Sequence, residues 1–217
     1  MTKVTKGDRS ESKAYYKENF SMIDLYSDIS IQQALHWLGY NKNYNVYGID
    51  GVLGDKGGAS LSREDIKDLQ QDNGLDPDGV WGFDTQHVAQ NLLWTVQATE
   101  HFHMSEFACE TNVEGTVHDE GCNGWPEIMN ITFLGLLEEL RRKVDQAIVV
   151  TSGVRCQTFN DSLSGSAADS YHRLGRAADI YCSGWSPTGI GRLAESLGLK
   201  TIVYETFTHV QYNGEGY

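Results

Sequence analysis

The stretch SYHRLGRAAD, residues 170–179, decides the fold of the C-terminal half, because it places His172 and Asp179 seven residues apart. On one helix these two side chains would lie about 10 Å apart along the axis. Two ligands of a single zinc ion lie only about 3 to 4 Å from each other, since metal–ligand bonds are near 2 Å. If both residues bind one metal, we therefore expect a loop with His172 that folds back through Gly175 onto a strand with Asp179.

A third ligand is needed, because a catalytic zinc usually has three protein ligands and one open position for water. The best candidate is His209, in the run FTHVQY, residues 207–212. The alternation of this run predicts a strand with His209 on the same side as Phe207 and Gln211. A lone histidine on a strand is more often an ordinary core or surface residue. Its combination with the preceding motif favours a ligand.

Hydrophobic patterns around this stretch predict further helices and strands. An amphipathic helix is expected from Thr132 through Val144, and β-branched residues predict a strand at 147–151. The other expected elements are a Gly- and Ser-rich loop at 152–176, strands at 177–182, 201–204 and 208–212, and a helix at 189–197. This order predicts an α+β fold for the C-terminal half.

The N-terminal half shows a different pattern, with three short helices and an internal repeat. The first helix is expected from an N-cap at Ser30 to Gly39, the second begins at Ser62, and the third follows Thr85. Between them the chain repeats DGVLG, residues 50–54, as DGVWG, residues 78–82. We interpret each Asp-Gly pair as a tight turn. A calcium loop is the alternative, although the regular oxygen ligands that end in a glutamate are missing.

Two family resemblances follow from these motifs. Residues 28–93, with IQQAL at 31–35, LGY at 38–40 and the two DG turns, look like the peptidoglycan-binding family of three-helix modules. An unrelated helical spacer is the alternative. Residues 100–214, with TSGVRC at 151–156, the 170–179 stretch and Tyr204 to His209, resemble the zinc D-Ala-D-Ala carboxypeptidase family, including its phage endolysin members. The second resemblance implies one zinc ion on His172, Asp179 and His209.

The same resemblance suggests the remaining site residues. Glu205 fits the carboxylate that takes a proton from water and passes it to the leaving amine, although several relatives have this acid three residues before the histidine, where Thr206 stands here. A solvated glutamate at a strand end is the alternative. Arg155 is expected to hold a substrate carboxylate or an oxyanion. Ser170 and Tyr204 are expected beside the ligands or the substrate. Gln211 stands where many relatives have Asp, and it is given no catalytic role.

Composition excludes several other classes of protein. The net charge of −13 argues against a nucleic-acid partner, and no stretch approaches the roughly 20 apolar residues that membrane insertion needs. The cysteines form no CxxC pair, so a zinc ribbon is not favoured, and free or buried thiols are expected, with a disulfide as the alternative. These cysteines are Cys109, Cys122, Cys156 and Cys182. His101, His103 and His118 are interpreted as exposed polar residues.

The expected architecture is α+β: a flexible arm at 1–22, a three-helix peptidoglycan-binding module at 23–95, and a zinc peptidase domain with a mainly antiparallel sheet at 100–217. The expected function is an endolysin, a zinc-dependent peptidase that cuts stem peptides or cross-links of bacterial peptidoglycan and lyses the host. The alternatives are a carboxypeptidase of wall remodelling and a non-catalytic wall-binding protein with a structural metal. We expect a monomer. Because no signal peptide is evident, we expect the protein to stay in the host cytoplasm until its release to the wall.

Overall fold

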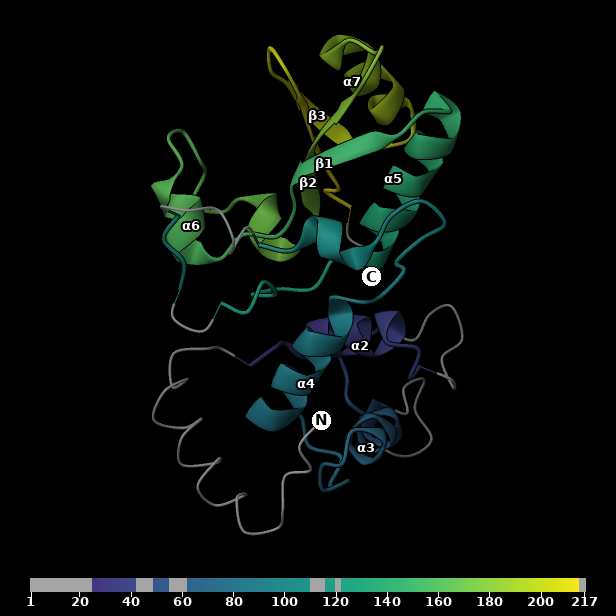
Figure 1. Cartoon of the computed structure of the whole chain (residues 1–217), viewed down its shortest axis with the longest axis vertical. Helices are drawn as coiled ribbons and strands as arrows, with labels where there is room; N and C mark the ends of the chain where they lie inside the picture. The colour runs from purple at the N-terminus through teal and green to yellow at the C-terminus, as the bar shows by residue number, and fades with distance from the viewer. Residues whose placement is uncertain (1–24, 42–48, 55–61, 110–115, 120–121, 215–217) are drawn as a thin grey trace.

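The computed structural model describes residues 25–41, 49–54, 62–109, 116–119 and 122–214. The arm expected at 1–22 lies outside these residues. Helices α2, α3 and α4 gather in one part of the molecule, and a sheet with helices α5 and α7 forms the other part (Figure 1). No described helix is long and apolar enough to cross a membrane. The predicted order, a helical module followed by an α+β domain, is confirmed.

The helical module consists of α2 (Asp28–Trp37), α3 (Ser62–Asp72) and α4 (Phe83–Leu93). Its interior is made of buried apolar side chains from all three helices, namely Ile31, Leu35, Ile66, Leu69, Ala89 and Leu93. Two predicted helix starts were wrong. Ser27 rather than Ser30 caps α2, since its side chain accepts a hydrogen bond from the Ser30 amide. Helix α4 begins at Phe83, before Thr85, whose hydroxyl accepts a hydrogen bond from Gln70.

The repeated DG turns are built in the same way, each around a buried glutamine. Gln70 accepts a hydrogen bond from the Gly79 amide at 2.9 Å and donates to the Val80 carbonyl and the Asp78 carboxylate, both at 2.9 Å. Gln32 makes the equivalent bonds to the turn at 50–52. Because each Asp carboxylate is engaged within its own turn, the interpretation as tight turns is confirmed.

The C-terminal part combines helices with a four-stranded sheet in the order β1-β2-β4-β3, in which every neighbouring pair is antiparallel. Its elements are η1 (Met104–Phe107), α5 (Ile131–Val144), β1 (Ile148–Ser152), α6 (Gln157–Ser162), η2 (Tyr171–Leu174), β2 (Ala177–Cys182), α7 (Pro187–Ser196), β3 (Lys200–Val203) and β4 (Thr208–Gln211). The predicted strands are confirmed within a residue or two. The region predicted as a loop at 152–176 contains α6 and η2, which are too short to show a hydrophobic period.

Helix α7 covers one face of the sheet. The Thr208 hydroxyl donates to the Pro187 carbonyl at 2.8 Å, and Gly191 lies against the side chains of Thr201 and Val203. Since neighbouring residues of a strand point to opposite faces, His209 points away from α7. The face opposite α7 therefore carries the candidate site.

The two parts of the molecule meet at residues 125–129. The Trp125 carbonyl accepts hydrogen bonds from the Tyr26 hydroxyl at 2.6 Å and from Gln90 at 2.9 Å. The Trp37 indole donates to the Met129 carbonyl at 2.8 Å. All of these bonds join the helical module to the segment that precedes α5.

Candidate metal centre

Strand register brings two of the predicted ligands together. Asp179 of β2 is the direct partner of His209 of β4, and Ser152 of β1 is the partner of Asp179 on the other side. The distance from His209 Nδ1 to Asp179 Oδ1 is 2.9 Å. Side chains of directly paired strand residues are close neighbours on one face, so the sheet itself sets this contact.

His172 comes from the short turn η2, as the sequence predicts for a loop that folds back onto β2. Its Nε2 lies 3.3 Å from Asp179 Oδ1 and 3.1 Å from His209 Nδ1. The turn ends at Gly175, whose φ of +63° belongs to the left-handed region, and a Cβ there would overlap the Ile128 carbonyl. The chain can therefore deliver His172 to the sheet only with glycine at this position.

Hydrogen bonds fix which nitrogen of each histidine faces the centre of the cluster. His172 Nδ1 donates to the Gly153 carbonyl at 2.6 Å, which leaves Nε2 with a lone pair. His209 Nε2 donates to Gln211 Oε1 at 2.9 Å, which leaves Nδ1 with a lone pair. The amide of Gln211 is held in this orientation because its nitrogen donates to Asn213 at 2.6 Å.

The chemistry of this donor set fits a metal ion. Two imidazole lone pairs and Asp179 Oδ1 converge within 2.9–3.3 Å of one another, with both imidazole protons committed elsewhere. A tetrahedral zinc with bonds of about 2.0–2.1 Å separates its ligand atoms by about 3.3 Å. Three facing lone pairs repel each other unless a cation lies between them, so the residues fit the zinc site predicted on His172, Asp179 and His209.

The electrostatic states of His172 and Asp179 suit a cation. Burial lowers the pKa of His172 and keeps its imidazole neutral. Burial alone would raise the pKa of Asp179, but the charge of the adjacent Arg155 helps to hold it below its ordinary range. A neutral imidazole at His172 and an ionised carboxylate at Asp179 are the protonation states that metal binding requires.

Arg155 lies beside the cluster, as predicted, and contacts Asp179 directly. Its Nη2 is 2.5 Å from Asp179 Oδ2, and its Nε donates to the Ser152 hydroxyl at 2.9 Å. These bonds leave Oδ1 of Asp179 for the metal position. A guanidinium has five N–H donors, so these two bonds leave further donors on Arg155.

The other predicted site residues lie in surface turns. Glu205 and Tyr204 belong to the turn between β3 and β4, which is closed by the Tyr204 amide donating to the Phe207 carbonyl at 3.0 Å. Tyr204 stacks on Phe207, with ring centroids 4.4 Å apart. Glu205 is exposed and, within the part of the chain that the structure describes, it forms no hydrogen bond or ion pair. Ser170 is half-buried and precedes η2.

Exposed apolar side chains occupy the same face of the sheet as the cluster. Tyr181 stands two residues after Asp179 on β2 and is 43% exposed, and Ile202 is the direct partner of His209 on β3 and is 52% exposed. Val149 pairs with Tyr181 and is also exposed. Tyr181, Ile202 and Val149 form an apolar strip beside the proposed metal position, on the face of the sheet opposite α7.

Sequence reasoning missed three groups that support the ligands: Gln211, the Gly153 carbonyl and Ser152. The alternation at 207–212 predicted that Gln211 lies on the side of His209, but not that it accepts a hydrogen bond from the His209 ring. No sequence signal identifies the Gly153 carbonyl. Glycine is needed at this position because a Cβ would overlap the backbone of Phe107, and that contact exists only in the folded chain.

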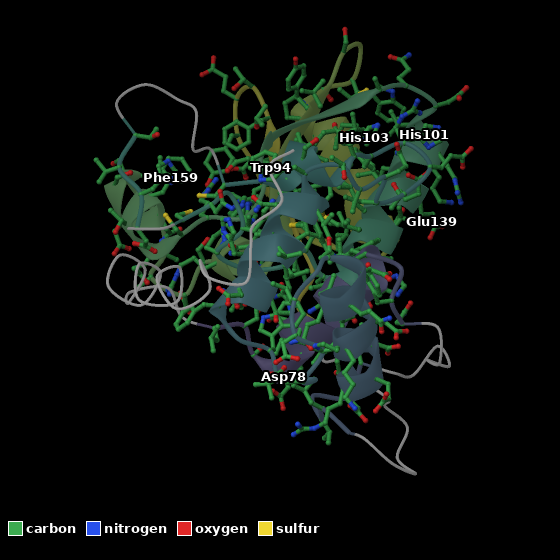
Figure 2. All side chains as sticks on the ribbon, turned by 60° about the horizontal axis from the view of Figure 1, so that its bottom comes forward. Asp78, Trp94, His101, His103, Glu139 and Phe159 are labelled. Carbon is green, nitrogen blue, oxygen red and sulfur yellow. The ribbon has the colours of Figure 1, made fainter. Side chains whose placement is uncertain are left out.

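The histidines interpreted as exposed polar residues have different surroundings. His101 is exposed and pairs with Glu138 at 2.6 Å, and the exposed His103 caps η1. Figure 2 shows these two histidines on the side of the domain opposite Phe159. His118 was placed wrongly, since it is half-buried, stacks on Phe159, and lies within 4.8 Å of three cysteine sulfurs.

Comparisons with known families identify the chain as a metallopeptidase with a peptidoglycan-binding domain. The sequence profile of the family described as Peptidase M15 matches residues 100–211, and the profile of a putative peptidoglycan binding domain matches residues 29–88. The chain belongs to the Peptidase M15 family, whose members are zinc-dependent, and it acts on peptidoglycan. A search among curated proteins finds no match. The domain bounds 23–95 and 100–217 stay a prediction.

Proposed function

We propose that this protein is a zinc-dependent endolysin that hydrolyses peptide bonds in the stem peptides or cross-links of bacterial peptidoglycan. The observation that carries the proposal is the convergence of three ligand lone pairs, each oriented by a further hydrogen bond or ion pair. In the proposed site His172 Nε2, His209 Nδ1 and Asp179 Oδ1 hold one zinc ion. When bound there, zinc supplies a Lewis acid that polarises the scissile carbonyl and lowers the pKa of a water molecule.

The proposed role of Glu205 is to move a proton. Its carboxylate takes a proton from the attacking water and returns it to the leaving amine as the C–N bond breaks. Its position in the turn that leads into β4, four residues before His209, supports this role. Because the side chain is exposed and makes no hydrogen bond among the described residues, it is free to rotate toward a bound peptide.

Arg155 has two proposed roles. Its ion pair with Asp179 keeps that carboxylate ionised and oriented. Its remaining N–H donors bind the carboxylate of a stem peptide or the developing oxyanion, which a planar guanidinium does in a bidentate manner. Ser170 and Tyr204 are proposed to contact substrate at the rim, and the strip formed by Tyr181, Ile202 and Val149 gives the aliphatic parts of the peptide an apolar surface.

The helical module is proposed to hold the enzyme on its insoluble substrate, which raises the effective concentration of cleavable bonds. The contacts of Trp125 with Tyr26 and Gln90 attach this module to the peptidase domain. In the endolysin role that we propose, the protein collects in the host cytoplasm as a monomer and reaches the wall when the membrane is breached. Two alternative roles differ from the endolysin in what they release from the wall. A carboxypeptidase of wall remodelling would release D-alanine, and a wall-binding protein with a structural metal would release nothing.

The test is release of soluble amines from purified peptidoglycan by the full chain, before chelation, after chelation and after zinc is restored. His172→Ala is the inactive variant, and His103→Asn is the matched control, because His103 is exposed and asparagine can still cap η1. We expect zinc-dependent release by the wild type and the control, and none by His172→Ala. Release of D-alanine alone would identify a carboxypeptidase. Wall binding without any release of amines would contradict the peptidase proposal and favour a non-catalytic wall-binding protein.

A further inference from the structure

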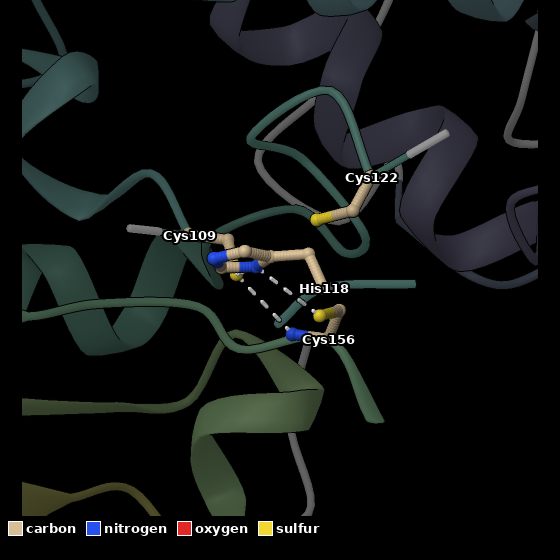
Figure 3. A group of neighbouring side chains, drawn as sticks. All are labelled: Cys109, His118, Cys122 and Cys156. Atoms are coloured by element: carbon tan, nitrogen blue, oxygen red, sulfur yellow. Dashed lines mark hydrogen bonds between the residues drawn. The ribbon is translucent and has the colours of Figure 1, made fainter. Parts of the chain in front are cut away.

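A second cluster of metal-ligating side chains lies outside the candidate active site. Cys109, His118, Cys122 and Cys156 each offer one ligand atom, and these four atoms all lie within 4.8 Å of one another. Figure 3 shows the four side chains pointing toward one another, three from residues 109–122 and the fourth, Cys156, from much later in the sequence. We propose that this cluster binds a structural zinc ion in tetrahedral Cys3His coordination.

The distances within the cluster match that coordination. His118 Nδ1 lies 3.4 Å from Cys109 Sγ and 3.5 Å from Cys156 Sγ. With Zn–S bonds near 2.3 Å and Zn–N bonds near 2.0 Å, a tetrahedral site separates sulfur from nitrogen by about 3.5 Å. Thiolate and imidazole ligands in a four-coordinate site select zinc among the common divalent ions.

The surroundings orient the ligands in the way that metal sites require. His118 Nε2 hydrogen-bonds to the Thr116 hydroxyl at 3.0 Å, so the other nitrogen, Nδ1, faces the sulfurs. The amide of Asp119 donates to Cys156 Sγ at 3.4 Å, and the amide of Cys156 donates to Cys109 Sγ at 3.4 Å. Such N–H donors stabilise the thiolate form that binds metal.

Two other uses of these thiols fit the geometry less well. A catalytic thiol must reach substrate, but Cys109 and Cys156 are each only 1% exposed. A disulfide joins two sulfurs at about 2.05 Å. It would leave the third sulfur and the histidine without a role, and all the cysteines are free in the structure. A metal ion uses all four side chains at once.

The proposed zinc joins three segments that position the active site and the module junction. Cys156 directly follows Arg155, whose amide donates to the His172 carbonyl at 3.2 Å. The amide of Cys109 donates to the Gly124 carbonyl at 2.8 Å, next to Trp125 at the junction. The ion therefore acts as a cross-link, and no step of the hydrolysis passes through it.

Cobalt substitution separates this site from the catalytic one. The proposed catalytic ligands are nitrogen and oxygen only, so thiolate-to-cobalt charge-transfer absorption reports the cysteine cluster alone. We expect this absorption in the cobalt-loaded wild type and in His172→Ala, and its loss in Cys122→Ser. Cys182→Ser is the matched control, because Cys182 lies in β2 outside the cluster, and it should keep the full signal.

Zinc content measured on the same four proteins gives a second readout. We expect about two ions per chain in the wild type and in Cys182→Ser, and about one in His172→Ala and in Cys122→Ser. The proposal can be tested on the wild-type spectrum alone, so the test does not depend on whether a variant folds. Absence of thiolate-to-cobalt absorption in the cobalt-loaded wild type would overturn it. A disulfide among Cys109, Cys122 and Cys156, found by mass spectrometry of the native chain, would also overturn it.

Discussion

Gln211 makes the strongest test of how the active-site ligands are oriented. Its Oε1 lies 2.9 Å from His209 Nε2 and accepts a hydrogen bond from it, which directs Nδ1 toward the proposed zinc. Gln211→Leu removes this acceptor while keeping the side-chain volume similar. Groups that orient metal ligands typically contribute 10- to 100-fold in metal affinity or activity, which is about 1.4–2.7 kcal/mol.

The assay is a zinc competition titration against a chromophoric chelator, together with amine release from peptidoglycan. We expect Gln211→Leu to weaken the active-site zinc by about 10- to 100-fold. Gln211→Glu keeps an acceptor and should hold zinc at least as tightly as the wild type. Asn213→Ala, which removes only the exposed partner of Gln211, should change the affinity little. Wild-type zinc affinity in Gln211→Leu would refute the orientation argument.

Three further predictions concern catalysis and folding. Glu205→Gln should lower kcat for amine release by about 100-fold or more while zinc content stays unchanged. Full activity of this variant would show that another group transfers the proton. Gly175→Ala should cost about 3 kcal/mol or more, because its φ is +63° and the Cβ overlaps the Ile128 carbonyl; an unchanged Tm would contradict this. Gln70→Leu removes the partner of the Gly79 amide and of the Val80 carbonyl, which should cost about 1–3 kcal/mol for each unpaired group. We expect this variant to bind less to purified walls in a pull-down, and we expect Gln71→Leu, at an exposed position, to bind like the wild type. Equal wall binding by the two variants would contradict the account.

Much of the candidate metal centre was predictable because His172 and Asp179 lie in one short motif and His209 lies in a run with clear alternation. The seven-residue spacing of His172 and Asp179 excludes a helix and requires a turn, and the alternation at 207–212 predicts the side of the strand on which His209 lies. The structure brings these three residues together as predicted. Strand positions were predictable for the same reason, since β-branched runs and alternation are local signals.

The cysteine cluster was not predictable in this way. Its residues have no CxxC pair, and Cys156 is 34 positions after Cys122, so only the folding of the chain brings the four side chains together. The buried glutamines Gln32 and Gln70 were hidden for a related reason. Each occupies an ordinary helical position in the sequence, and its hydrogen bonds to a distant turn appear only in the fold.

The most direct test of the central claim is anomalous X-ray diffraction at the zinc edge from crystals of the active, zinc-loaded protein. The account predicts a peak within about 2.0–2.2 Å of His172 Nε2, His209 Nδ1 and Asp179 Oδ1. Active, zinc-loaded protein with no peak at this position would contradict it.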